Sequence, residues 1–288
     1  MDKSKGKYIF SENETSDIIN SYLNGESSVS ISKRYGLNNH KPILKLLHSN
    51  NVSVNRSLST RKYKLNEKYF DLIDSPNKAY ILGFLFADGS LNKDKQTISM
   101  SLQEDDWDIL EKIRNEIDSE KQLEFLNYSN KKDFGYTYKN QYRLSMFSKY
   151  MCESLINIGM VQNKSLILEF PNIPKEFHSH FIRGYFDGDG SFCAYYTKEN
   201  KFQPLVTITS TEQFCIKIQN ILRDNLNIPC GNIYEASCKN GITKVLSISG
   251  SIQTKKVLDW LYHDAELFLE RKHEKYINAF YLNNSLSA

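Results

Sequence analysis

The chain has 288 residues, a net charge of +3, 40% hydrophobic residues and 25% charged residues, which is typical of one large or two modest globular domains. No apolar run approaches the ~20 residues of a membrane-spanning helix, and the initial MDKSKGKYIF lacks a secretion signal's apolar core. We therefore expect no membrane contact and an intracellular protein, in the cytoplasm, on the nucleoid or in an organelle. Five scattered cysteines without CxxC spacing predict reduced thiols and no zinc site.

Residues 1–52 are predicted to form a small all-α domain of three short helices. Ser11 and Glu14 have the spacing of a capping box at the first helix, and the last helix is expected from Asn38 to Asn50. Two short helices joined by a Gly-containing turn are typical of a helix-turn-helix, whose final helix enters the major groove by its N-terminal residues. The candidate DNA contacts are Asn38, Asn39, His40, Lys41 and Lys45. A simple packing unit of three helices is the alternative.

A basic linker is predicted over residues 53–74. The stretch from Ser53 to Lys64 has few large apolar residues and many cations, so we expect it to lie along phosphate groups rather than in a core. Its candidate phosphate contacts are Arg56, Arg61, Lys62 and Lys64.

An internal repeat decides the predicted fold class. Residues 80–90 (YILGFLFADGS) return as residues 181–191 (FIRGYFDGDGS), so Asp88 and Asp189 occupy equivalent positions. Each copy continues with a strand pair, an amphipathic helix, a second strand pair and another helix. The strands include 97–103 and 142–146 in the first copy and 205–209 and 244–248 in the second, and the helices between them span 106–117 and 212–226. The prediction is an α+β fold of two pseudo-symmetric αββαββα half-domains, residues 75–174 and 175–288, packed through the two motif helices.

The two motif helices are predicted to pack closely and to end together. Each is apolar on nearly every side, and small residues four apart (Gly83 with Ala87, Gly184 with Gly188) put the closest approach on one face. Asp88 and Asp189 then emerge side by side, and two adjacent carboxylates repel unless cations lie between them. Helix C-termini add negative dipole ends and spare carbonyl oxygens, which favours Mg²⁺, with Mn²⁺ or Ca²⁺ able to occupy the same sites. Such ions promote phosphodiester hydrolysis.

The repeated motif resembles that of the LAGLIDADG homing endonucleases of the single-chain, two-motif kind, and residues 181–192 (FIRGYFDGDGSF) are a close match. The resemblance covers about residues 75–281 and implies that Asp88 and Asp189 are metal-binding catalytic acids. It also marks Lys164, before FPNIP, and Lys272, in LERK, as catalytic lysines that stabilise transition-state charge or organise the attacking water. Arg271 competes with Lys272 for this role. Asp187 has no counterpart in the first motif, where Phe86 stands, so we expect it to be structural.

The resemblance further implies a monomer that binds double-stranded DNA at a long, weakly palindromic target, with its sheets in the major groove. Strand alternation then selects the residues that face DNA. The candidates are Ser90, Asn92, Thr97, Ser99, Gln141 and Arg143 in the first repeat, and Ser191, Cys193, Tyr195, Thr197, Thr207 and Thr209 in the second. Arg143 is best suited to a bidentate contact with guanine, although a register error of one residue would invert any assignment.

Two alternatives use the same scaffold. One is an RNA-binding maturase, and the other is a catalytically inactive DNA-binding regulator. The presence of both Asp88 and Asp189 favours cleavage over either. His178 and His180 lie close in sequence, but no third ligand has useful spacing, so we interpret them as structural.

Overall fold

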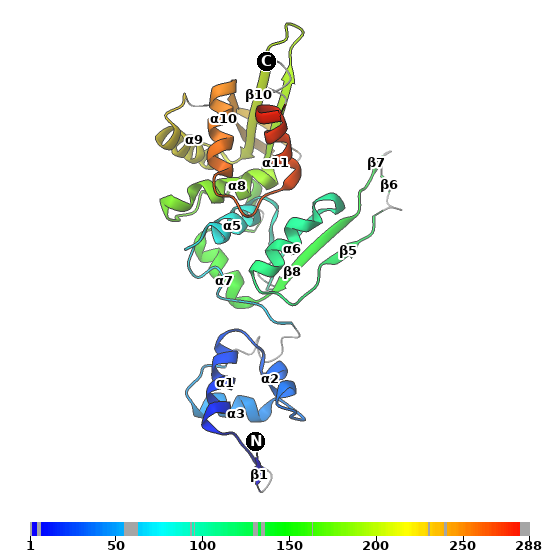
Figure 1. Cartoon of the computed structure of the whole chain (residues 1–288), viewed down its shortest axis with the longest axis vertical. Helices are drawn as coiled ribbons and strands as arrows, with labels where there is room; N and C mark the ends of the chain where they lie inside the picture. Colours follow the sequence, from blue (N-terminus) through cyan, green and yellow to red (C-terminus); the bar gives the residue numbers. More distant parts are fainter. Residues whose placement is uncertain are drawn as a thin grey trace. The chain divides into compact units, whose positions relative to one another are not determined.

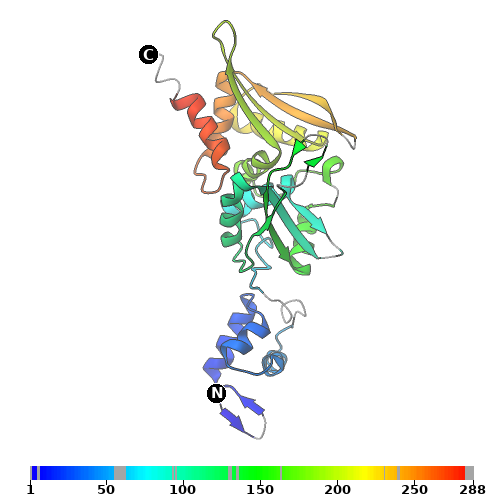
Figure 2. The same cartoon turned by 90° about the vertical axis from the view of Figure 1, so that its right-hand side faces the viewer.

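The computed structural model describes residues 2–4, 7–54, 63–92, 94, 96–128, 132–133, 136–162, 164–229, 231–238 and 241–282. The chain divides into two compact units (Figure 1 and Figure 2): Met1–Lys68 with Arg114–Gln122, and Tyr69–Ile113 with Leu123–Ala288. The division after Lys68 falls inside the predicted linker. No helix in the described part of the chain is long and apolar enough to cross a membrane.

The N-terminal unit contains the three expected helices, α1 (Glu12–Leu23), α2 (Ser28–Arg34) and α3 (Lys41–Ser49). The capping box is present, because the Ser11 hydroxyl accepts from the Glu14 amide at 3.3 Å and the Glu14 carboxylate accepts from the Ser11 amide at 2.9 Å. The unit is not all-α as predicted, since β1 (Asp2–Ser4) and β2 (Lys7–Ile9) form an antiparallel hairpin before α1. Strands of three residues are too short for alternation to reveal.

The third helix begins three residues later than predicted. Asn38, Asn39 and His40 precede α3, and the Asn39 side-chain oxygen accepts from the Lys41 amide at 3.0 Å. Pro42 lies in the first helical turn, where its missing amide costs no helical hydrogen bond. The core of the unit consists of apolar side chains from all three helices, including Ile18, Ile31, Ile43 and Leu47.

The predicted linker, residues 53–74, contains buried apolar residues in its second part. Leu65, Tyr69, Phe70 and Ile73 are buried, so the part after residue 62 contributes side chains to a core. The many cations before these residues led to the prediction of a linker for the whole range. The apolar residues that follow the cations were the available signal of a buried segment.

The larger unit holds two four-stranded antiparallel sheets with the same strand order. The first is β3-β4-β8-β5 and the second is β9-β10-β12-β11. The first sheet comprises β3 (Ser90–Asn92), β4 (Thr97–Gln103), β5 (Glu124–Leu126) and β8 (Gln141–Phe147), and the second comprises β9 (Gly190–Tyr196), β10 (Phe202–Ser210), β11 (Asn232–Cys238) and β12 (Gly241–Ser249). A small hairpin, β6 (Lys132–Asp133) with β7 (Tyr136–Thr137), is additional. The predicted duplicated α+β fold is confirmed.

Helices follow the repeat as well. The first copy has α5 (Pro76–Asp88), α6 (Trp107–Glu116) and α7 (Lys149–Ile158), and the second has α8 (His178–Asp189), α9 (Glu212–Leu226) and α10 (Ser251–Tyr262). Single 3-10 turns cover Glu104–Asp106 (η1), Lys164–Leu166 (η2) and Lys175–Phe177 (η3). The second copy continues into α11 (Glu270–Ile277) and a π-helical turn, η4 (Asn278–Leu282). This extension was not predicted, and Phe280 packs it against Phe192 and Phe202 of the second sheet.

Helices α5 and α8 pack against each other along their small residues, as predicted. A Cβ added to Gly83 would overlap the carbonyl oxygen of Phe181, and one added to Gly184 would overlap that of Tyr80. A Cβ on Gly188 would overlap the side chain of Ala87. These contacts leave no room for larger side chains, so the two helices meet backbone to backbone and end together at Asp88 and Asp189.

Candidate active site at the end of the motif helices

Asp88 and Asp189 are the last residues of α5 and α8. Each is followed by a glycine with extended backbone, Gly89 or Gly190, at which the chain turns from the motif helix toward its first strand. The Cβ position of Gly188 lies 3.1 Å from the carboxylate oxygen Oδ2 of Asp88, so the Asp88 side chain reaches the helical turn that carries Asp189. The close packing of two helices therefore brings together two acids that are far apart in sequence.

The two carboxylates share one electrostatic environment. Both residues are exposed to solvent on one side, and protein surrounds their carboxylates on the other sides. This burial raises the pKa of Asp88 to about 6, with a further upward contribution from the charge of Asp189. Burial also raises the pKa of Asp189, while Lys164 opposes that shift. A cation placed between the acids would favour the charged form of both.

Lys164 and Lys272 make equivalent contacts with the ends of the two helices. The ammonium of Lys164 donates to the carbonyl oxygens of Leu85 (2.8 Å) and Gly89 (2.6 Å). That of Lys272 donates to Phe186 (2.7 Å) and Gly190 (2.7 Å), the matching positions of the second repeat, and to Asp187 (2.8 Å). Lysines therefore bind five carbonyl oxygens at the two helix ends, and the use of helix-end carbonyl oxygens as metal ligands stays a prediction.

Burial also changes the proton affinity of the two lysines. It lowers the pKa of Lys164 and of Lys272 to about 8, although the nearby acids act in the opposite direction. An ammonium group next to helix C-termini is favoured by the negative end of the helix dipole. The site thus combines two carboxylates with two ammonium groups that titrate close to neutral pH.

The structure distinguishes the two candidates in the LERK segment. Lys272 reaches the end of α8, whereas the Nε of Arg271 donates to both carboxylate oxygens of Asp106, at 2.8 and 3.0 Å. Arg271 keeps 57% of its side chain exposed, but its charge still lowers the pKa of Asp88. It therefore lies at the edge of the site rather than at the helix end.

Asp187 lies behind the site. It is 1% exposed, and its carboxylate accepts from the Tyr80 hydroxyl at 2.9 Å, the Leu269 amide at 2.9 Å and the Tyr262 hydroxyl at 3.5 Å. Burial raises its pKa to about 6, while the charge of Lys272 opposes the shift. The sequence indicated a structural acid here, but it did not indicate its partners.

Arg183 is a buried charge that sequence reasoning missed. Its guanidinium donates to the carbonyl oxygens of Leu267 (2.9 Å) and Leu261 (2.8 Å) and lies 2.9 Å from the His180 ring nitrogen Nδ1. His180 thus contacts Arg183, and no group of three His, Cys, Asp or Glu side chains in the described ranges is arranged to hold a metal ion. An arginine inside an apolar helix was the available signal, because such a charge needs buried partners.

One face of each sheet is polar and accessible, with the alternation that the sequence predicted. Ile98, Met100 and Leu102 of β4 are buried, as are Val206 and Ile208 of β10. The candidates Ser90, Ser191, Cys193 and Tyr195 are exposed, and Asn92, Thr97, Ser99, Gln141, Arg143, Thr207 and Thr209 are partly exposed. Thr197 lies beyond the end of β9, in the turn, where its hydroxyl accepts from the Lys201 amide at 3.2 Å. Counting every second residue from Ser191 placed Thr197 in the strand, but β9 ends at Tyr196.

Two further residues of this face were missed. Ser101 pairs with Arg143 across β4 and β8, and Gln103 pairs with Gln141. The Arg143 Nε donates to the Ser101 hydroxyl at 3.0 Å. Continuing the same alternation two and four residues past Ser99 would have identified both.

The N-terminal candidates belong to the N-terminal unit. Asn38, Asn39, Lys41 and Lys45 are exposed and His40 is partly exposed. Lys64 is not a free cation, because it pairs with Asp118 at 2.6 Å. Arg56, Arg61 and Lys62 lie outside the described residues. DNA contact by this unit stays a prediction.

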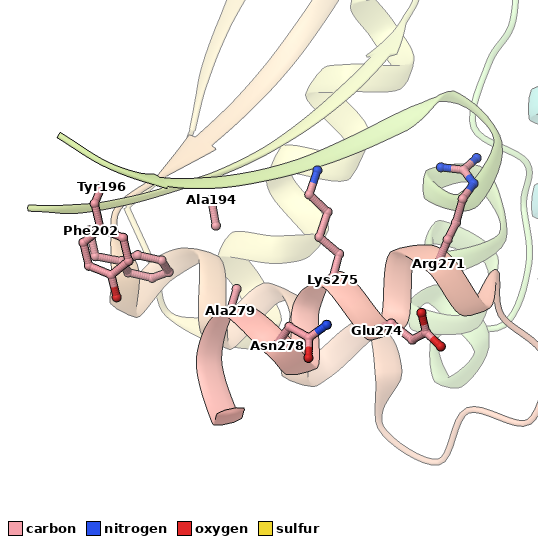
Figure 3. A pocket seen from close by; sticks show the side chains of 8 residues that line it. All are labelled: Ala194, Tyr196, Phe202, Arg271, Glu274, Lys275, Asn278 and Ala279. Carbon is pink, nitrogen blue, oxygen red and sulfur yellow. The ribbon is translucent and has the colours of Figure 1, made fainter. Parts of the chain in front are cut away.

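A groove of about 460 Å³ lies between α11 and the hairpin of β9 and β10 (Figure 3). Its lining residues are Ala194, Tyr196, Phe202, Arg271, Glu274, Lys275, Asn278 and Ala279. Figure 3 shows the side chains of Arg271 and Lys275 extending from α11 on the side of the strands. In the described part of the chain, Lys275 has no carboxylate within salt-bridge distance, so its charge is available to an external anion.

Comparison with known proteins gives a family match over the second repeat. Residues 176–259 match the family described as LAGLIDADG-like domain. The chain is 31% identical over 150 residues to the DNA-directed RNA polymerase subunit Rpo1C of Methanocaldococcus jannaschii, covering 52% of this chain and 16% of that protein. It is 28% identical over 183 residues to an uncharacterized protein of the same organism, covering 61% and 64%. The chain therefore spans less than two thirds of either relative.

Solved structures with a similar arrangement are distant in sequence. The I-LtrWI LAGLIDADG homing endonuclease bound to target DNA is 14% identical, with a TM-score of 0.48 over 77% of this chain and 92% of that one. The LAGLIDADG homing endonuclease I-GzeII in complex with its DNA target is 14% identical, with a TM-score of 0.47 over 74% and 91%.

Proposed function

We propose that the chain, whose residues 176–259 match the LAGLIDADG-like domain family, is a site-specific endonuclease that cuts both strands of double-stranded DNA with divalent metal ions. One observation carries the proposal. Each of two packed helices ends in an acid, and a lysine, partly buried at the first helix (Lys164) and buried at the second (Lys272), binds carbonyl oxygens of each helix end. A purely structural helix pair has no need of two adjacent carboxylates whose repulsion opposes folding.

The donor set fits Mg²⁺. Asp88 and Asp189 offer hard carboxylate oxygens, and Mg²⁺ is usually bound by one or two carboxylates together with substrate phosphates and waters. The absence of a third acidic or histidine ligand within the described residues is compatible with that pattern. When bound, such ions supply positive charge to the phosphoryl group that reacts. Mn²⁺ or Ca²⁺ fits the same donors.

The lysines contribute charge and a proton. Their ammonium groups are held at the helix ends, where they are fixed before substrate arrives and stabilise negative charge that develops on phosphate oxygens. A pKa of about 8 is close to the pH at which general acids and bases are most effective. Lys164 Nζ and Lys272 Nζ are therefore the atoms proposed to hold or donate a proton near the scissile phosphates.

The two polar sheet faces are proposed to bind the major groove on either side of the cut. A duplicated scaffold in one chain suits a monomer and a weakly palindromic target, because its two half-sites are similar but not identical. Arg143 is the candidate for reading guanine. Arg271 and Lys275 lie beyond the edge strand β9, where the phosphate backbone that borders an occupied major groove would run.

A selection experiment tests the proposal directly. The purified chain is incubated with a randomised double-stranded DNA library and Mg²⁺, and the cleaved ends are sequenced. We expect double-strand breaks within one related set of sequences, abolished by a chelator. A folded chain that binds DNA tightly but leaves it uncut with Mg²⁺ or Mn²⁺ would instead indicate a regulator. A chain that binds only structured RNA would indicate a maturase.

A further inference from the structure

The carboxylate of Asp187 is fixed between the two repeats. Tyr80, on α5 of the first repeat, donates to its Oδ2 at 2.9 Å, and so does the amide of Leu269, far along the second repeat. The side chain does not reach the solvent. It is therefore available neither to DNA nor to a metal ion, and its effect on the site must pass through the groups that it binds.

One of those groups begins the helix that carries Lys272. Leu269 is the N-cap residue of α11, and it provides no side-chain cap to the helix. The Lys272 amide donates to the Leu269 carbonyl at 3.0 Å, so the two residues belong to one helical turn. By accepting from the Leu269 amide, Asp187 holds the start of that turn in place.

The same residue also binds the other end of the lysine. The Lys272 ammonium donates to the main-chain carbonyl of Asp187 at 2.8 Å, next to its contacts with Phe186 and Gly190. Asp187 thus contacts the backbone from which the side chain starts and the nitrogen in which it ends. A side chain with four rotatable bonds keeps one geometry when both of its ends are fixed.

The first repeat has no such acid. Phe86 occupies the position equivalent to Asp187, is fully buried and offers no side-chain acceptor. Lys164 lies on the 3-10 turn η2 rather than on a helix. Its segment is tied down differently, because the Thr211 hydroxyl of the second repeat donates to the Leu168 carbonyl.

We propose that Asp187 is a positioning residue for Lys272. Only the half-site of the second repeat, which contains Lys272, depends on a buried acid of this kind. Loss of the carboxylate releases the first turn of α11 and lets the Lys272 ammonium leave the end of α8. Lys164 keeps its place. As a consequence that rests on the proposed nuclease function, the two strand cuts respond unequally to changes at Asp187.

The positioning itself is tested without DNA or metal. The folded protein is treated with limiting acetic anhydride, and mass spectrometry gives the acetylation rates of Lys272 and Lys164 in the same sample. Lys272 is 7% exposed in the wild type and should react slowly. In Asp187→Ala we expect Lys272 to react several-fold faster and Lys164 to react as before. Equal increases at both lysines would indicate general loosening and would overturn the proposal, as would an unchanged Lys272.

Three variants separate positioning from ordinary core damage. Asp187→Asn retains an oxygen that can accept from the Leu269 amide, so it should restore much of the protection of Lys272. Tyr80→Phe removes one donor to Asp187 and should produce a small increase at Lys272 alone. Phe86→Leu damages the core at the equivalent position of the first repeat and should leave the ratio of the two lysines unchanged. If Asp187→Ala does not fold, Tyr80→Phe decides, because a Lys272-to-Lys164 acetylation ratio that stays at the wild-type value in that variant rejects the proposed positioning by Asp187.

The strand-specific consequence is measured next, on a cleavable target labelled on each strand. Asp187→Ala should shift the ratio of the two nicking rates in the same direction as Lys272→Met and in the direction opposite to Lys164→Met. A shift toward the Lys164→Met pattern would contradict the proposal. A wild type that does not cut removes the nuclease function but leaves the acetylation result valid, so the two failures are distinguishable.

Discussion

The two repeats place the same charged groups at the ends of their motif helices but support them differently. Each has an acid at a helix end and a lysine on the carbonyl oxygens of that end. Lys272, however, is carried by helix α11, whose start is held by three contacts. Asp187 accepts from the Leu269 amide, and Asp106 accepts from Arg271. The Lys112 ammonium lies 3.0 Å from the Glu270 carboxylate. Lys164 is carried by a single 3-10 turn. The two repeats thus share the contacts at the helix ends but differ in the residues that support the two lysines.

Each lysine segment also depends on the opposite repeat. Asp106 and Lys112, which hold the start of α11, belong to the first repeat, and Thr211, which binds the Leu168 carbonyl after Lys164, belongs to the second. Neither half-site is therefore complete within its own repeat. Substitutions at equivalent positions of the two repeats therefore test which of these contacts have the same effect in both.

The largest effect is expected at the acids, where the repeats should behave alike. Asp88→Asn and Asp189→Asn keep the side-chain shape but remove charge that the proposed reaction needs. Loss of one preorganised electrostatic group commonly costs about 10²- to 10³-fold in rate, and we expect at least this loss on both strands. Single-turnover cleavage with Mg²⁺, together with a melting curve, measures it.

The control is Asp264→Asn, an exposed acid in a left-handed turn position that asparagine adopts readily. It should cut at the wild-type rate. DNA affinity of the two active-site variants should be retained or increased, because repulsion of phosphates falls. Wild-type cutting of both strands by folded Asp189→Asn would refute the assigned chemistry.

Equal effects are also expected at the helix crossing. Gly83→Ala and Gly184→Ala each place a methyl group on a carbonyl oxygen of the partner helix, and overpacking of this kind typically costs about 1–3 kcal/mol. Chemical denaturation should show similar losses in the free energy of unfolding for the two variants. A large loss in one and none in the other would show that the crossing is less symmetric than its contacts indicate.

The stability of the metal-free protein should respond to pH through Asp88. Burial raises its folded-state pKa to about 6, from 3.8. Between these values the folded chain binds more protons than the unfolded chain, so this acid lowers stability as pH rises and its penalty is fully present above about pH 6. Asp88→Asn should therefore raise the melting temperature at neutral pH, and the gain should shrink as pH falls toward the unfolded value. A gain that is independent of pH would assign the effect to packing instead of charge.

The smallest effect is expected at the edge of the second repeat, at α11, whereas the lysine segment of the first repeat is a 3-10 turn in the described residues. Lys275→Gln should reduce the slope of log affinity against log salt by up to about 0.9, the value for one lost phosphate contact, while sequence preference stays the same. Binding is measured over a salt series with Ca²⁺. The control, Lys217→Gln on the exposed side of α9, should leave the slope unchanged. Identical slopes in all three proteins would remove α11 from the DNA interface.

Much of the architecture is readable from the sequence because it depends on local and periodic patterns. The return of YILGFLFADGS as FIRGYFDGDGS identifies the duplication, and Gly83 and Gly184 identify the helix faces that meet. Strand alternation separates the buried face of β4 from its polar face without any coordinates. Such patterns need only the side-chain periods of helices and strands, which are constant across proteins.

The tertiary structure alone decided how the charges are satisfied. Nothing local to Lys272 indicates that its ammonium binds three carbonyl oxygens at the end of α8, or that Arg271 beside it binds Asp106. The partners of Asp187 are likewise far from it in the chain. A buried charge must find donors or acceptors wherever packing places them, and packing joins residues whose separation in sequence carries no periodic signal. The sequence therefore determined which acids and lysines are candidates for the reaction, and only the fold determined what holds each of them in place.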